Sequence, residues 1–245
     1  MYLLYEIINP NTLLNQYFLF KDWLKNKFVR KMIKIFYFIL LLFCIPVEAQ
    51  NTKLGKEVFE LSNYISSKEF VSLKERMNDL SRTDSLYKEA LRITHDNYSE
   101  ALFALIFTTV PYNEVPLKIP LLSFIINYPL VSANDSLFNL KNKNLPKNLF
   151  FDSPTDSFGD KDKLAHFFGA AFISYSSSLF DLGDLIGYFV EVFEQNFKVQ
   201  SSIDRRDLRA DELGDIFGKL LKENKNILPS QILLIKTFFY LRFNL

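Results

Sequence analysis

A histidine and several carboxylates recur at helical spacing in the C-terminal third of the chain. Asp162 and His166 stand four residues apart, and so do Asp207 and Asp211. At 3.6 residues per turn, the two members of each pair occupy one stripe of a helix. Carboxylate and imidazole groups bind divalent metal ions and act as general acids and bases. The spacing therefore predicts a candidate polar site that draws on more than one helix.

Each of these stripes also carries glycine, and a third predicted helix repeats the arrangement with Glu191 as its acidic residue. Glycine has no side chain to hold a neighbouring helix away. Close approach of helices beside carboxylates and a histidine is what a shared polar site requires. The glycines predicted to allow this approach are Gly169, Gly187, Gly214 and Gly218.

Two interpretations of the polar residues stay open. The first is a buried polar network that fixes the packing of the last helices, in which Asp162 and Asp207 also benefit from the dipole at a helix N-terminus. The second is a divalent metal ion, the only cofactor suggested, which would need an open coordination position and a pocket. The metal-ligand candidates are Asp162, His166, Glu191 and Asp211, and the structural network comprises His166, Glu191, Asp207 and Asp211.

The pattern of apolar residues predicts an all-α fold, a compact helical bundle without a sheet. Prolines interrupt the stretch 111–154, which is therefore expected to form an irregular connector with short helices. A turn is predicted near Arg82, Thr83 and Asp84. The expected helices cover 53–70, 72–91, 97–109, 162–179, 182–198, 207–224 and 229–243.

The motif strings of residues 160–220 also resemble a known family. The order Asp162-Lys163-x-x-His166-Phe167, then Glu191, then Asp207-x-x-x-Asp211-x-x-Gly214-x-x-x-Gly218 is similar to VanZ-like proteins and to YfiM-like predicted periplasmic lipoproteins. Glu194 and Asp211 stand where VanZ-like proteins usually have Gln and Asn. The resemblance implies an envelope protein, closer to the water-facing YfiM-like type, and it supplies no assured catalytic residue.

The N-terminal region predicts export. Arg30, Lys31 and Lys34 precede an apolar run at 35–45, which ends before the small-residue site at Ala49. A basic segment, an apolar segment and a small-residue cleavage site in this order are typical of a signal peptide. Residues 32–49 are therefore predicted to be the signal peptide, 1–31 an extension from a start codon assigned too early, and 50–245 a single helical domain in the periplasm or at the outer envelope.

The N-terminal region allows other interpretations, two for the apolar run and one for residues 1–31. An uncleaved membrane anchor is disfavoured because the apolar run is shorter than the roughly 20 residues of a spanning helix. A lipoprotein is disfavoured because Phe43, rather than a small residue, precedes Cys44. Residues 1–31 could instead form an amphipathic segment on a membrane surface, since aromatic residues around Trp23 alternate with lysines.

Composition narrows the class of partner. The 245 residues contain 29 basic and 28 acidic side chains, and the apolar share of 49% is that of an ordered globular protein. This near balance of charges lacks the excess of basic residues that is typical of nucleic-acid-binding proteins. The partners suggested are a membrane surface, an envelope lipid or a cell-wall component.

Three functions of different class follow from these patterns. The leading one is a non-enzymatic helical envelope protein with a structural or binding network at the motif. The second is a metal-dependent enzyme acting on an envelope lipid or cell-wall precursor. The third is a membrane-embedded module in which 164–179 and 227–243 enter the bilayer, although Lys236 opposes this.

Overall fold

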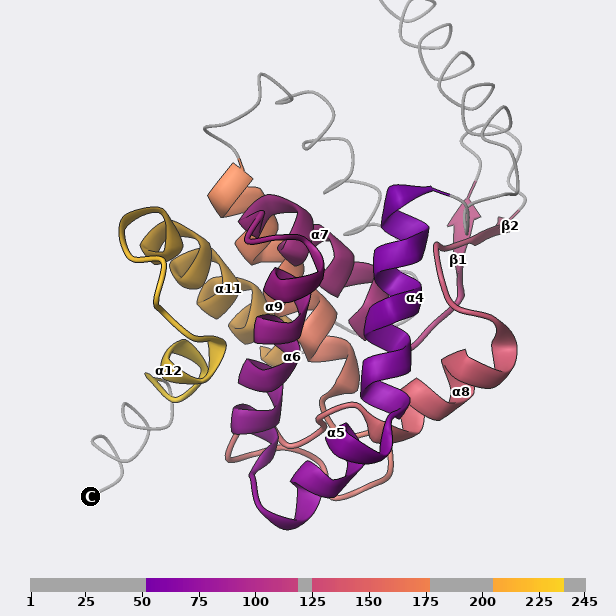
Figure 1. Ribbon diagram of the computed structural model, residues 1–245, viewed down its shortest axis with the longest axis horizontal. Coiled ribbons are helices and arrows are strands. Elements are labelled where there is room, and N and C mark those ends of the chain that lie inside the picture. Colours follow the sequence, from indigo (N-terminus) through magenta and orange to yellow (C-terminus); the bar gives the residue numbers. More distant parts are fainter. Residues whose placement is uncertain (1–51, 119–124, 177–204, 236–245) are drawn as a thin grey trace, which may run out of the picture. The chain divides into compact units, whose positions relative to one another are not determined.

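The computed structural model describes residues 52–118, 125–176 and 205–235, which all belong to one structural unit of the chain, 49–245. Most of the described residues are helical, so the predicted all-α class is confirmed (Figure 1). The predicted signal peptide at 32–49, the extension before it and the helix at 182–198 lie outside the described residues. Gly187 and Glu191 lie outside them too.

Three capped α-helices and a short 3-10 turn begin the described chain. Each α-helix starts where a side-chain oxygen accepts a hydrogen bond from a backbone amide in the first turn, which satisfies a donor that the helix itself leaves unpaired. The capping residues are Thr52, Ser67 and Asn78. The elements are α4 (Lys53–Ser66), α5 (Lys68–Ser72), η2 (Leu73–Glu75) and α6 (Asp79–Ile93).

The turn predicted at Arg82, Thr83 and Asp84 is wrong, because these residues lie inside α6. The chain instead changes direction before α6, where Asn78 is extended and caps the helix. Arg82 is 1% exposed, and its guanidinium pairs with Asp79 of the same helix at 2.6 Å. Arg82, one of the three polar residues from which the turn was predicted, thus belongs to an ion pair inside the helix.

Helix α7 (Tyr98–Thr109) occupies the centre of the bundle and matches the predicted helix at 97–109. It packs against α4, α6 and α9, and beyond its first turn most of its residues are buried, as expected of a helix that is apolar on most sides. The helix ends at Val110, before Pro111, whose ring cannot continue an α-helix. Its buried residues are Ala101, Leu102, Ala104, Leu105, Ile106, Phe107, Thr108 and Thr109.

The connector after α7 is irregular, as predicted, but it contains a two-stranded antiparallel ribbon that the expectation of no sheet did not include. Strand β1 (Glu114–Lys118) pairs with β2 (Ile125–Pro129), with Glu114 opposite Pro129. Both strands are edges, which is why they tolerate proline. The ribbon is followed by α8 (Asp135–Asn144), whose N-terminus is capped by Asn134.

Helices α9 (Lys161–Ser176) and α11 (Arg205–Glu223) pack closely side by side. They run in the same direction, since Lys163 meets Asp207 near their N-termini and Ala171 meets Gly218 further along. These helices confirm the predictions at 162–179 and 207–224 over their described residues.

An aromatic cluster joins this helix pair to the rest of the core. The Phe217 ring of α11 lies 5.4 Å from Tyr87 of α6 and 5.4 Å from Phe167 of α9, measured between ring centroids. The described chain ends with α12 (Pro229–Leu233), which starts where the helix 229–243 was predicted. Within the three described ranges, no helix combines the length and the apolar character needed to cross a bilayer.

Candidate functional site

The structure brings together four of the five predicted site residues. Asp162 and His166 of α9 face Asp207 and Asp211 of α11 across the contact between the two helices, which we call the α9–α11 seam. The fifth, Glu191, lies outside the described residues. The polar residues that the spacing placed on one stripe of each helix thus lie close to each other between α9 and α11.

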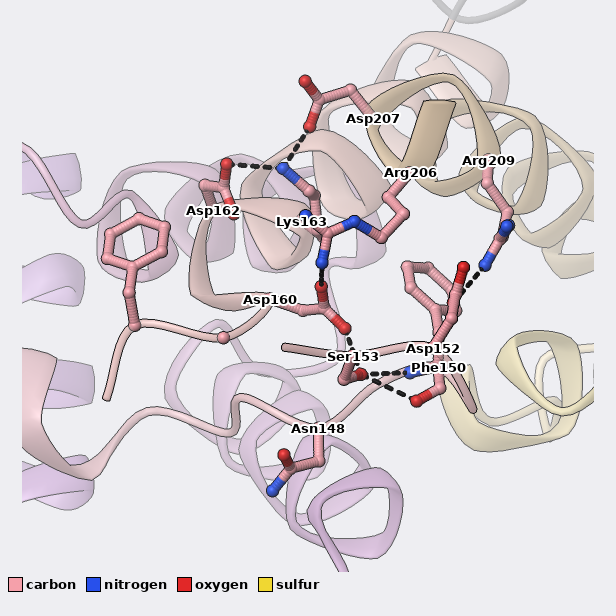
Figure 2. Close-up of polar contacts among 12 residues, drawn as sticks. Asn148, Phe150, Asp152, Ser153, Asp160, Asp162, Lys163, Arg206, Asp207 and Arg209 are labelled. Atoms are coloured by element: carbon pink, nitrogen blue, oxygen red, sulfur yellow. Dashed lines mark hydrogen bonds and ion pairs between the residues drawn. The ribbon is translucent and has the colours of Figure 1, made fainter. Parts of the chain in front are cut away.

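A lysine that sequence reasoning did not select lies in the seam, near the N-termini of both helices. The Nζ atom of Lys163 lies 2.7 Å from Oδ2 of Asp162 and 2.6 Å from Oδ1 of Asp207 (Figure 2). Only 5% of this side chain is exposed, while the two carboxylates are 16% and 17% exposed. Burial lowers the pKa of Lys163, but the hydrogen bonds and charges of both aspartates more than offset this and raise the pKa. The seam thus contains its own internal cation.

His166 takes the next position along the seam. Its Nδ1 lies 3.0 Å from Oδ1 of Asp211, and its Nε2 lies 3.6 Å from Oδ1 of Asp207. Burial lowers the pKa of the imidazole, whereas the hydrogen bond to Asp211 and the nearby carboxylates raise it, and the net direction is upward. The carboxylates thus favour the protonated form of the ring relative to a histidine in water, and a carboxylate oxygen can only accept, so Nδ1 is the donor to Asp211.

Two of the predicted glycines determine how closely the helices approach. A Cβ atom at Gly214 would overlap the carbonyl oxygen of Phe167, and one at Gly218 would overlap that of Ala171. These two predictions are confirmed. Gly169 differs, because a Cβ there meets no heavy atom within 4 Å among the described residues. Gly169 is thus not part of the close approach to α11.

A second buried carboxylate lies next to the seam, at the N-terminus of α9. Asp160 is fully buried, accepts a hydrogen bond from the Ser153 hydroxyl and pairs with Arg206 Nη1 at 3.0 Å (Figure 2). Burial raises the pKa of Asp160, and Ser153 and Arg206 oppose that rise. The guanidinium of Arg206 thereby holds the first turn of α11 to the segment that precedes α9.

Two features tie the connector to this end of the seam. Gly159 adopts a positive φ of 61°, which glycine allows without strain, and a Cβ there would clash with the Lys147 backbone. The pKa of Tyr112 is raised by burial and by the charges of Asp162 and Asp207, with Lys163 opposing. Tyr112 therefore lies within electrostatic range of the seam, and the connector borders the polar cluster.

The hollow beside Tyr112 does not open onto the seam residues. It has a volume of about 330 Å³ and is polar in part, with Glu114 accepting a hydrogen bond from Asn127 at 2.9 Å. None of the predicted site residues lines it. The lining residues are Pro111, Tyr112, Asn113, Glu114, Pro116 and Asn127.

The donor set of the seam suits an ammonium ion better than a divalent metal. Among the described residues, no three His, Cys, Asp or Glu side chains converge as a metal site requires. Two of the carboxylates, those of Asp162 and Asp207, already share the Lys163 ammonium. A metal ion there would lie next to a buried positive charge, which Coulomb repulsion in a weakly screened environment disfavours. The described seam residues therefore do not fit a divalent metal ion.

Comparison with known protein families, with curated proteins and with solved structures finds no match to this chain.

The spacing of residues around Lys163 could have indicated that this lysine is buried and paired. Lys163, Phe167 and Ala171 are spaced four residues apart, so they share one face of α9, and that face is apolar apart from the lysine. A lysine that begins an apolar stripe must either extend to solvent or find an anion. Asp160 gave no such signal, because its partners Ser153 and Arg206 come from two other segments.

Proposed function

We propose that this chain is an exported helical protein of the cell envelope, without catalytic activity at the α9–α11 seam, whose charged residues hold two helices in fixed register. The observation that carries the proposal is the Lys163 ammonium, buried between Asp162 and Asp207 at 2.7 and 2.6 Å. A catalytic acid, base or metal ligand must be able to change its proton or its partner during a reaction. Asp162 and Asp207 neutralise a buried lysine, so a change of proton or partner at either carboxylate would leave the ammonium without a counter-charge.

Membership of the VanZ-like and YfiM-like group forms part of the same proposal. Each described polar or glycine position of the motif has a structural contact: Asp162, His166, Asp207 and Asp211 in the seam, and Gly214 and Gly218 at the helix approach. A motif retained for packing would be expected to use all of these positions together. The envelope location rests on the basic, apolar and small-residue order of 30–49.

Metal content and thermal stability test the structural role. The chain and its His166→Ala and Asp211→Asn variants would be assayed for bound divalent ions by mass spectrometry and for Tm with and without chelator. We expect no stoichiometric ion, no change of Tm with chelator, and a lower Tm for His166→Ala than for the parent chain. A stoichiometric ion that is lost with chelator and with either substitution would refute the structural role and favour a metal-dependent activity.

Export has a separate test. Mass spectrometry of the chain recovered from the periplasm of a bacterial host should show an N-terminus next to Ala49. Replacing an apolar residue of the predicted signal, Leu41→Arg, should leave the chain uncleaved in the cytoplasm, while Leu41→Val should not. Recovery of the uncleaved parent chain in the cytoplasm would contradict the proposal.

A further inference from the structure

Four lysines gather where three segments of the described chain meet, at the end of the bundle from which α6 and α9 start. The backbone of Lys147 holds these segments together. Its amide nitrogen lies 3.1 Å from Oδ2 of Asp79, the first residue of α6, and its carbonyl oxygen accepts a hydrogen bond from the amide of Asp160 at 2.8 Å. The four residues, which we call the basic patch, are Lys74 of η2, Lys143 of α8, Lys147 of the connector and Lys161, the first residue of α9.

The surroundings of Lys74 show that acidic groups do not neutralise this patch. Partial burial lowers the pKa of Lys74, the charge of Arg82 lowers it further, and Asp79 opposes them with a smaller effect. The carboxylate of Asp79 already pairs with the Arg82 guanidinium at 2.6 Å. Next to Lys74, the exposed Glu75 and Arg76 carry opposite charges, which offset each other. Lys74 thus adds its positive charge to the surface.

The lysines of the patch also act on one another. Partial burial, and then the charges of Lys147 and Lys74, lowers the pKa of Lys161, while Asp156 opposes the shift. The Nζ atom of Lys147 donates to the backbone carbonyl oxygen of Asp156 at 2.6 Å. A cluster of charges of one sign destabilises the compact state through repulsion and attracts partners of the opposite sign. The basic patch is therefore suited to an anionic partner.

Exposed apolar side chains accompany three of the lysines, each at a distance of three residues along the chain. Met77 follows Lys74 and is 43% exposed, Leu140 precedes Lys143 and is 46% exposed, and Phe158 precedes Lys161 and is 40% exposed. In α8, a spacing of three residues makes Leu140 and Lys143 neighbours on the helix surface. Ammonium groups beside exposed apolar side chains are the combination that binds at a lipid–water interface.

We propose that the basic patch is a docking surface for a lipid bilayer that contains anionic phospholipids. Such a bilayer presents many phosphate groups in one plane, so several lysines can be neutralised together. It also offers an apolar layer just below the headgroups, which can accept Met77, Leu140 and Phe158. A free phosphate would neutralise charge but would leave these apolar side chains in water. The docking surface is independent of the role assigned to the seam, because its residues make none of the ion pairs of the seam.

Vesicle sedimentation with matched charge variants tests the proposal in the full chain. The variant Lys74→Gln/Lys143→Gln/Lys161→Gln removes three patch charges. The control, Lys56→Gln/Lys88→Gln/Lys222→Gln, removes three exposed lysines of other elements and has the same net charge. With vesicles of phosphatidylcholine and phosphatidylglycerol, the patch variant should bind roughly 100-fold more weakly than the parent chain, from about fivefold per lysine. The control variant should keep most of the affinity, and both variants should keep the Tm of the parent chain.

A fluorescent label locates the contact, which matters because the apolar run at 35–45 can itself bind lipid. Cys44 is the only cysteine, so Cys44→Ser provides a thiol-free background for a label that responds to polarity. A label at Ser157→Cys, beside Phe158, should shift to the blue with anionic vesicles. A label at Lys222→Cys should not, because α9 and α11 are parallel and the last turn of α11 is remote from Lys161.

Four results would overturn the proposal. The first is equal binding of the patch and control variants to anionic vesicles. The second is equal binding of the parent chain to anionic vesicles and to vesicles of phosphatidylcholine alone. The third is a blue shift that is as large at position 222 as at position 157. The fourth is loss of vesicle binding in inorganic phosphate but not in sodium chloride of the same ionic strength, which would assign the lysines to a free anion.

Discussion

Among the residues that the structure describes, Lys163 and Lys141 are both buried, and they differ in what surrounds them. Lys163 of α9 lies between two carboxylates, and its pKa is raised. Lys141 of α8 is 1% exposed, donates one hydrogen bond to the carbonyl oxygen of Val110 at 2.7 Å, and has its Nζ 4.5 Å from the Phe138 ring centroid. Burial, and then the like charge of Lys161, lowers the pKa of Lys141 to about 7.

The difference shows that burial alone does not decide whether a charge stabilises the fold. Desolvation opposes both ammonium groups, and only the one with opposite charges beside it recovers that cost. Arg82 is a third case, with one carboxylate, Asp79, at 2.6 Å and one carbonyl oxygen, that of Asn144, at 2.5 Å. In the seam, negative carboxylates lie beside the buried ammonium of Lys163. The ammonium of Lys141 instead contacts the uncharged carbonyl of Val110 and the ring of Phe138.

Removing the cation of the seam should have the largest effect. Lys163→Met leaves Asp162 and Asp207 close together without their shared ammonium, so we expect a loss of about 3–5 kcal/mol in the free energy of unfolding. Urea unfolding followed by circular dichroism measures this. Lys163→Arg retains the charge and should lose less. A methionine variant as stable as the parent chain would show that the seam is not held by its charges.

The close approach of the two helices should come next. Gly214→Ala forces a Cβ against the Phe167 carbonyl, so α9 and α11 must move apart, with an expected cost of about 1–3 kcal/mol. Gly169→Ala, on the flank of α9, is the matched control and should change stability less. Equal effects of the two alanines in thermal unfolding would mean that the seam is not set by Gly214.

Lys141 should respond in the opposite sense to Lys163. The folded state releases this proton near pH 7 and the unfolded state only near its ordinary value of 10.5, so the unfolded state binds more protons between these values. The destabilisation is full below pH 7 and fades as the pH rises towards 10.5.

Lys141→Met should therefore be more stable than the parent chain by about 1 kcal/mol at pH 6, with a smaller gain at pH 9.5. The exposed Lys143→Met in the same helix is the control and should show no such trend. A loss of stability at pH 6 would mean that the Val110 hydrogen bond outweighs desolvation.

The smallest effect is expected from the titration of His166. Its folded pKa lies above the ordinary 6.5, so its contribution is complete below pH 6.5 and is lost as the pH rises through the folded pKa. Because Asp211 is 45% exposed, the contribution should be about 0.2–1 kcal/mol. The stability difference between the parent chain and His166→Gln, measured at pH 5.5 and 8.5, should shrink at the higher pH. A constant difference would indicate that the imidazole does not titrate in this range.

Local sequence features predicted the helices well where capping and periodicity agreed. Asn97 and Pro111 bracket α7, and the prediction matched it almost to the residue. The turn at Arg82 was wrong because a buried arginine and its aspartate look like surface residues in a one-dimensional pattern. The β1–β2 ribbon was missed because each strand has only five residues and contains proline.

The sequence by itself determined which residues share a helix face, since four-residue spacing fixes that geometry within one helix. It thereby found Asp162 with His166, Asp207 with Asp211, and the glycine stripe of α11. Only the tertiary structure decided that α9 and α11 run parallel and that Lys163 lies between them. The physical reason is that His166 and Asp211 are 45 residues apart, and their pairing depends on how two separate helices pack rather than on any local preference of the chain.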